Sequence, residues 1–326
     1  MIALPPFFLG QSCRAEQEPV LSIYVETRIR GSMDELWRLT QTPDLHERWD
    51  LRFTSITYLQ RASDSEPQRF RYATRMGFGL EIEGWGETVG ERTVDGTRTL
   101  ALQFGSEDRR SLIRAGSGFW RYEKVQDHVR FITGYDYEVR WGVIGRALDG
   151  LVFRPLMGWA TAWSFDRLRL WIEAGVEPRR AARQALVHAL AATAVAFVWM
   201  WHGIVPKLAG PHPDELAMLL EAGVSEPLLR PVALILGAME LAFGLAFLAF
   251  ARRRWPWLLT LILMAVATVG VLVNSPHRAV GAFAPVTLNL LLAVLAAVGL
   301  LSLRDLPSAR RCLRRAPKEL HVENGS

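Results

Sequence analysis

Residues 231–251, PVALILGAMELAFGLAFLAFA, decide how the second half of the chain folds. This run has 21 residues and one ionisable side chain, Glu240, and about 20 mostly apolar residues are enough for a helix to cross a bilayer. Three further runs have the same character, at 185–205, 255–273 and 280–303. A soluble protein can bury one such helix, but four neighbouring ones leave no polar shell to cover them. The sequence therefore predicts four transmembrane helices.

Positive side chains are unevenly distributed over the two ends of these helices. Twelve lie on the side of the chain termini: Arg179, Arg180, Arg183, Arg252, Arg253, Arg254, Arg304, Arg310, Arg311, Arg314, Arg315 and Lys318. The opposite side has Lys207, Arg230 and Arg278. The positive-inside rule therefore predicts a multi-pass protein whose N-terminal domain and C-terminus are cytoplasmic. Arg greatly outnumbers Lys, which favours a GC-rich bacterium and hence a bacterial inner (plasma) membrane, and residues 1–10 lack the basic start of a signal peptide.

Charge divides the chain into two parts. Residues 1–178 hold 23 Lys and Arg against 25 Asp and Glu, and residues 179–326 hold 15 against 8. Because the basic excess falls among apolar runs, we do not expect a nucleic-acid partner. Two cysteines exclude a disulfide-rich scaffold and a Cys-based zinc cluster, and no metal site is predicted.

The first half alternates apolar and polar residues in the manner of β-strands. Such patterns occur at 20–30, 69–78, 97–105, 110–125 and 128–140, and a helical pattern follows from about 144 to 175. Ser32 and Glu35 have the spacing of a capping box, which predicts a short helix after the first strand. The order of strand, two short helices, antiparallel strands and a long helix indicates an α+β domain.

Residues 42–50, TPDLHERWD, and this order of elements resemble the polyketide-cyclase/START-like (SRPBCC) superfamily over residues 20–175. The resemblance implies a helix-grip fold, in which a curved sheet holds the long helix and leaves a cavity between them. It also implies binding of a hydrophobic molecule and, in some members, a reaction on it.

The membrane half resembles the DoxX-like proteins. The residues that carry this resemblance are 201–208, WHGIVPKL; 237–240, GAME, with Gly244; and 285–290, PVTLNL. The resemblance covers about 183–303 and implies a four-helix inner-membrane protein. Some relatives belong to quinone-linked oxidoreductase systems.

We therefore expect an α+β helix-grip (START-like) cytoplasmic domain fused to an all-α four-helix transmembrane bundle. The expected boundaries are an N-terminal extension at 1–19, the START-like domain at 20–178, the DoxX-like membrane domain at 179–303 and a basic cytoplasmic tail at 304–326.

Aromatic residues of the first domain are the candidates for lining a cavity: Tyr72, Trp85, Trp120, Tyr135, Tyr137 and Trp163. Such rings suit a flat or lipidic ligand, but they can equally fill a core. The polar residues to examine beside them are His46, Arg75, Arg121 and Asp136. No pair of them has the spacing of a catalytic dyad, so no catalytic residue is predicted.

Glu240 is the sharpest candidate in the membrane half, because an ionised carboxylate near mid-bilayer is costly unless it is paired or faces a polar cavity. Asn289 lies at a similar depth in a helix of the same direction, which predicts a contact between the two. Either a proton or quinone site or simple polar packing between helices explains such a contact. His202 is the third polar residue of this set, at the outer face.

The leading functional hypothesis is binding of a lipid, isoprenoid or quinone-like molecule through the START-like domain beside the bilayer. The alternatives are a component of a quinone-linked membrane oxidoreductase and a structural membrane protein without ligand. The sequence has no flavin, haem or nicotinamide motif. No cofactor is therefore identified, although a quinone stays open, and redox chemistry would need a partner subunit or a bound quinone.

Overall fold

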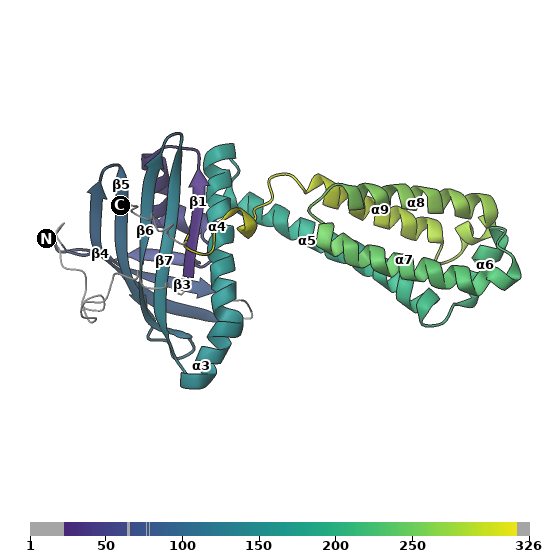
Figure 1. The fold of residues 1–326 in the computed structure, drawn as a ribbon, viewed down its shortest axis with the longest axis horizontal. Helices are drawn as coiled ribbons and strands as arrows, with labels where there is room; N and C mark the ends of the chain where they lie inside the picture. The colour runs from purple at the N-terminus through teal and green to yellow at the C-terminus, as the bar shows by residue number, and fades with distance from the viewer. Residues whose placement is uncertain (1–22, 64–65, 76, 78, 318–326) are drawn as a thin grey trace, which may run out of the picture. The chain divides into compact units, whose positions relative to one another are not determined.

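The computed structural model describes residues 23–63, 66–75, 77 and 79–317, so the expected extension at 1–19 lies outside the described residues. Within them the chain forms two compact units, whose ribbons are shown in Figure 1. One runs to Gly175 and resumes at Ser308, and the other spans Val176–Pro307. The first unit therefore contains residues from both ends of the chain.

Seven antiparallel strands form the sheet of the first unit, in the order β1-β7-β6-β5-β4-β3-β2. Two short helices, α1 and α2, separate β1 from β2, as the strand and capping patterns predict. The bounds are β1 Ile23–Ile29, α1 Met33–Gln41, α2 Pro43–Trp49, β2 Ser55–Tyr58, β3 Arg69–Arg75, β4 Glu81–Val94, β5 Thr97–Gly105, β6 Ile113–Val125 and β7 His128–Val139.

The long helix α4 (Arg154–Ala174) packs on one face of this sheet, which is called the concave face below (Figure 1). Alternate residues of β7 point to that face because side chains in a strand alternate, and Phe131 stacks on Phe165 of α4 with ring centroids 4.4 Å apart. Phe131, Phe165 and Leu168 are fully buried. The helix ends at Gly175, whose φ of 65° is the left-handed conformation that glycine adopts most readily. This arrangement is the expected helix-grip fold.

A short helix, α3 (Gly142–Leu148), and a π-helical turn, η2 (Asp149–Phe153), lead directly into α4. Together they make one helical run over 142–174. It begins with two left-handed residues, Trp141 at φ 64° and Gly142 at φ 55°.

The C-terminal segment, predicted as a separate basic tail, packs on the sheet domain instead. Leu313 and Glu26 exchange backbone hydrogen bonds of 2.9 Å in each direction, which extends the sheet beyond β1. The Cys312 thiol donates to the Ala162 carbonyl at 3.2 Å, and the Ser308 amide donates to Asp166 at 2.7 Å. The arginine-rich sequence of this segment does not predict the pairing, because an unpaired strand edge forms backbone hydrogen bonds with a partner segment regardless of that segment's side chains.

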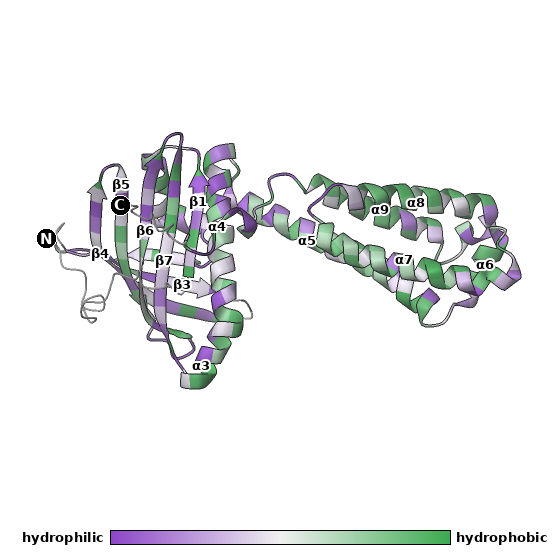
Figure 2. Ribbon diagram, viewed as in Figure 1, coloured by the Kyte–Doolittle hydropathy of each residue, from purple (hydrophilic) through white to green (hydrophobic). Residues whose placement is uncertain are grey.

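The second unit is a helical bundle. Its elements are α5 Pro178–Gly203, the π-helical turn η3 Ile204–Leu208, α6 Pro213–Glu221, α7 Leu229–Phe250, α8 Trp255–Asn274 and α9 Pro285–Leu301. Three helical segments are long and apolar enough to cross a membrane: Pro178–Leu208, Glu226–Phe250 and Trp255–Asn274. The fourth expected span is the apolar helix α9, which at 17 residues is shorter than the predicted 280–303. Figure 2 shows the hydrophobic character of α7, α8 and α9.

Close packing of α5 on α7 depends on glycines. A Cβ placed on Gly237 would lie 2.7 Å from the Cβ of Lys207 and 2.8 Å from the Gly203 carbonyl oxygen. A Cβ on Gly203 would lie 2.6 Å from the Gly237 carbonyl oxygen. Small residues let membrane helices approach closely, and here they bring the turn after α5 against the middle of α7.

Candidate functional site

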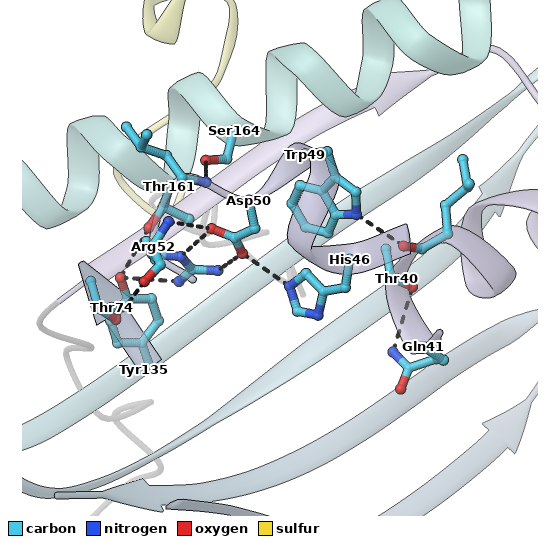
Figure 3. Close-up of polar contacts among 12 residues, drawn as sticks. Thr40, Gln41, His46, Trp49, Asp50, Arg52, Thr74, Tyr135, Thr161 and Ser164 are labelled. Carbon is cyan, nitrogen blue, oxygen red and sulfur yellow. Dashed lines mark hydrogen bonds and ion pairs between the residues drawn. The ribbon is translucent and has the colours of Figure 1, made fainter. Parts of the chain in front are cut away.

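Helix α2 and the turn after it bring three polar residues beneath α4 (Figure 3). Pro43 starts α2, and the helix ends where the Asp50 amide donates to the His46 carbonyl at 3.1 Å. The i, i+4 spacing of His46 and Asp50 places both side chains on one side of this short helix. Arg52 follows two residues later and turns back onto Asp50, so the segment builds a cluster from its own residues.

Asp50 is the centre of this cluster. One carboxylate oxygen accepts from the Arg52 Nε at 2.9 Å, and the other lies 2.6 Å from Arg52 Nη2 and 3.1 Å from His46 Nε2. Only 1% of Asp50 is exposed. Burial alone raises the pKa of this carboxyl, but the charge of Arg52 and the hydrogen bonds from His46 and Arg52 outweigh it and hold the pKa far below its usual range. Asp50 is therefore an ionised, fully paired acceptor.

Arg52 connects the cluster to the sheet and to α4. Its Nη1 lies 3.5 Å from the Tyr135 hydroxyl, which lies 3.0 Å from the Thr161 hydroxyl of α4. The backbone around it is held as well, because the Leu51 amide donates to Ser164 at 2.8 Å. Burial lowers the pKa of Arg52, but the Asp50 charge more than compensates and raises it. Arg52 is thus a permanently charged donor held in a defined place.

Aromatic rings surround the charged groups. His46 stacks on Trp49 at 4.8 Å and meets the edge of Trp120 at 5.0 Å. The Arg52 guanidinium lies 5.4 Å from the centroid of Phe53 and 5.8 Å from that of Tyr135. The concave face is therefore apolar apart from a few polar groups that are fixed by one another.

The concave face contains four of the six predicted aromatic residues: Tyr72, Trp120, Tyr135 and Tyr137. The first of them, Tyr72, lies against Gly84, and burial raises the pKa of its hydroxyl to about 12. Tyr137 donates to the buried Asp149 at 2.6 Å.

The other two predicted residues do not belong to this face. Trp85 follows Gly84 in β4, so its side chain points to the opposite face of the sheet, where it is 36% exposed. Trp163 belongs to α4, where it stacks on Trp159 at 6.0 Å and packs, partly buried, against the hydrophobic core of the domain. Alternation within a strand decides the correction for Trp85.

Of the polar residues singled out from the sequence, His46 alone belongs to the cluster. Arg75 pairs with Glu81 at the exposed end of a hairpin at 2.8 Å, and Arg121 and Asp136 lie on the outer face of the sheet. Asp50 and Arg52 were missed, although Asp50 ends the segment TPDLHERWD. The i, i+4 spacing of His46 and Asp50 was the available signal.

An open cleft lies elsewhere on this domain, between β1 and the C-terminal segment, with a volume of about 670 Å³. Charged residues line it, among them Arg28, Arg169 and Glu173. Arg169 and Glu173 pair with each other at 2.7 Å. Its many charged side chains do not suit the hydrophobic ligand that the sequence predicts.

A second polar cluster lies inside the helical bundle, around Lys207 of η3. Its ammonium is 3.0 Å from Glu240 of α7, 3.3 Å from Glu215 of α6 and 3.3 Å from the His202 carbonyl oxygen. Lys207 is only 6% exposed. Two carboxylates therefore share one ammonium.

The predicted contact between Glu240 and Asn289 is wrong as to the partner, because Glu240 pairs with Lys207. Equal depth did not make α7 and α9 neighbours: α5 packs against both of them. His202 contributes its backbone carbonyl to the cluster, and its side chain is exposed. Lys207 was counted only as a topology signal in the sequence.

Among the described residues, no group of three or more His, Cys, Asp or Glu side chains is placed to hold a metal ion. Both clusters offer hydrogen bonds and charge. Arg52 and Tyr135 can donate to an acceptor on an apolar molecule, and the Lys207 cluster combines one ammonium with two carboxylates.

Comparison with known proteins identifies a family for the helical unit and a relative that matches nearly the whole chain. The DoxX-like family model matches residues 196–297. The uncharacterized membrane protein YndG of Bacillus subtilis (strain 168) is 38% identical over 299 residues, which are 91% of this chain and 98% of YndG.

Solved structures resemble the sheet domain at low identity. The protein TTHA0849 from Thermus thermophilus is 17% identical with a TM-score of 0.34, over 47% of this chain and 99% of its own. Truncated norcoclaurine synthase from Thalictrum flavum is 15% identical with a TM-score of 0.33, over 47% of this chain and 92% of its own. The helix-grip assignment rests on the strand order and on α4. Since the match to YndG extends over nearly the whole length of both chains, this protein belongs to the YndG family of membrane proteins and carries a DoxX-like membrane domain.

Proposed function

We propose that this membrane protein binds a hydrophobic small molecule on the concave face of its sheet domain, with Arg52 and Tyr135 contacting a hydrogen-bond acceptor of that molecule. The observation that carries the proposal is the Arg52 guanidinium, which Asp50 fixes in a wall of aromatic rings. Binding sites for small molecules combine apolar walls with a few fixed polar groups in this way. A lipid, an isoprenoid or a quinone-like compound has the required chemistry.

The connection to a membrane domain supports an apolar ligand. Only Val176 and Glu177 separate Gly175 from the first residue of α5. A tether of this length keeps the binding domain at high effective concentration beside the bilayer. An apolar molecule can then exchange between protein and lipid without a long path through water.

Mass spectrometry of organic extracts from the purified full-length protein tests this proposal. We expect a stoichiometric apolar compound in the wild type and its loss in Arg52→Met, with the matched variant Arg121→Met, on the outer face of the sheet, unchanged. Because Arg52→Met leaves the Asp50 charge without its main partner, Tyr135→Phe serves as a milder variant that removes a single hydroxyl. Equal retention of the compound in all four proteins would contradict the proposed site.

A second candidate function is participation in a quinone-linked membrane oxidoreductase. The observation that favours it is the Lys207 cluster. An ammonium can donate to a quinone carbonyl, and a neighbouring carboxylate can supply or accept a proton. Electrons would have to come from a partner protein. In the same extraction experiment, a quinone lost in Lys207→Met and retained in Arg52→Met would favour this candidate. No compound above background in the wild type would favour the structural alternative.

A further inference from the structure

The helical run over 142–174 carries large apolar side chains on its outward side. They follow helical spacing through α3, η2 and the first turns of α4, and they are called the apolar stripe: Ile144, Leu148, Leu151, Val152, Leu156 and Trp159. Leu151 is 80% exposed and Ile144 is 77% exposed. Figure 2 shows hydrophobic ribbon at α3 and beside it.

The opposite side of the same run already makes the contacts with the sheet. Gly145 fits against the Arg140 backbone, which leaves no room for a Cβ. Asp149 accepts from Tyr137 at 2.6 Å, and Thr161 meets Tyr135 at 3.0 Å. The apolar stripe is therefore not a displaced part of the core. A surface helix of a soluble domain presents polar residues outward, whereas this helical run presents large apolar residues outward.

Charge along the run favours an anionic surface. Between residues 141 and 159 the charged residues are Arg146, Asp149 and Arg154. Asp149 is 1% exposed and is paired with Arg154, whereas both arginines are exposed. Trp141 and Trp159 lie at the two ends, and both are more than 40% exposed. Exposed aliphatic residues with arginines and terminal tryptophans are the composition of a helix that lies in a lipid interface.

A bilayer is always within reach of this domain, because the chain continues after two linker residues into α5, which belongs to a candidate membrane span. We propose that the apolar stripe docks into the headgroup region of the bilayer that holds the membrane domain, with the exposed Arg146 facing anionic lipids. Interfacial helices bury their apolar face about 5–10 Å into this boundary. The docking depends on the exposed face of 142–159 and is independent of the ligand proposed for the concave face.

Site-directed spin labelling of the full-length protein in vesicles tests the docking. Single cysteines replace Ile144 and Leu151 in a background with Cys13→Ser and Cys312→Ser. Matched controls replace Val94 and Val125, exposed apolar residues at the other end of the sheet. The vesicles contain phosphatidylcholine with phosphatidylglycerol. Collision rates are measured with oxygen, which concentrates among acyl chains, and with a water-soluble nickel complex.

We expect the ratio of oxygen to nickel collisions to be several-fold higher at Ile144 and Leu151 than at the two controls. The ratio should fall when Arg146→Gln is added or when phosphatidylglycerol is omitted. Low collision rates with both reagents at Ile144 and Leu151 would mean that protein covers the apolar stripe. A high collision rate with the nickel complex would mean that the stripe is exposed to water. Either result overturns lipid docking.

Discussion

The ammonium of Lys207 lies 3.0 Å from the carboxylate of Glu240, and this ion pair joins the turn after α5 to the middle of α7. Close approach at Gly203 and Gly237 makes the pair possible. Glu215 from α6 completes the cluster at 3.3 Å. Three segments of the bundle are thereby held at one ammonium group. We therefore expect the loss of Lys207 to lower the stability of the bundle strongly.

Lys207→Met should lower the thermal midpoint of the full-length protein strongly. Removing one partner of a buried ion pair leaves an uncompensated charge, at a cost of about 3–5 kcal/mol. Circular dichroism during heating in detergent measures the effect. The double variant Lys207→Met/Glu240→Leu should recover part of the loss, because it removes the charge left behind. Arg230→Met, at an exposed site of α7, is the control, and an equal loss there would argue against a specific role of the pair.

Gly237→Ala should destabilise the bundle, whereas Gly270→Ala should not. The added Cβ at Gly237 meets the Cβ of Lys207 at 2.7 Å, and at Gly270 nothing lies within 4 Å. Where the added Cβ meets no other atom, alanine in a helix stabilises the folded protein by about 0.5–1 kcal/mol relative to glycine. Thermal midpoints of the two variants decide the matter. If both changed stability alike, the close packing of α5 on α7 would be disproved.

Asp50→Asn should lower stability at neutral pH by about 3–5 kcal/mol, because Arg52 then lacks its charged partner. Asp50 also links stability to pH. Its pKa in the folded protein is lowered, so its contribution is complete above the ordinary carboxyl pKa, near 4, and disappears as the pH falls below that value.

Unfolding by denaturant at several pH values between 7 and 3 measures this linkage. The wild type should lose more stability over the acid part of this range than Asp50→Asn does. Asp34→Asn, at an exposed position of α1, serves as the control and should follow the wild type. A pH profile of Asp50→Asn that is parallel to that of the wild type would contradict the ionised state of Asp50.

The Cys312 thiol should react very slowly with thiol reagents at pH 8 in the folded protein. Burial raises its pKa to about 12, so little thiolate is present, and its hydrogen bond to Ala162 holds it in place. Leu313→Pro removes the amide that donates to Glu26 and should accelerate the reaction. Leu313→Ala keeps this amide and should react as slowly as the wild type. The rates are measured in a Cys13→Ser background. If the folded Cys13→Ser protein with Leu313 unchanged reacted fast, the C-terminal segment would not be docked on the sheet domain.

A cysteine in place of Val224, between α6 and α7, should react with an impermeant maleimide added outside intact bacterial cells. A cysteine in place of Ser326 should react only after the membrane is permeabilised. These outcomes follow from the positive-inside rule and from four spans. The reverse pattern would place both termini outside, and reaction of both sites in intact cells would exclude an even number of spans.

Local pattern was enough to predict the two-part architecture. Apolar runs longer than a bilayer is thick have no stable place in a soluble shell, and alternation with period two can form only half-buried strands. The run around Glu240 and the pattern of β7 therefore reveal a membrane helix and a sheet strand without any knowledge of their neighbours. The same holds for the order of elements, because it is the order of the patterns.

Partners and faces depended on the tertiary structure. Glu240 pairs with Lys207 and not with Asn289 because helix rotation and the glycine contacts decide which side chains meet. Trp85 points away from Tyr72 because strand register assigns the face. Leu313 joins β1 because the edge of a folded sheet offers hydrogen bonds that no local sequence signal records. Contacts between residues far apart in the chain arise from packing, and packing is a property of the assembled fold.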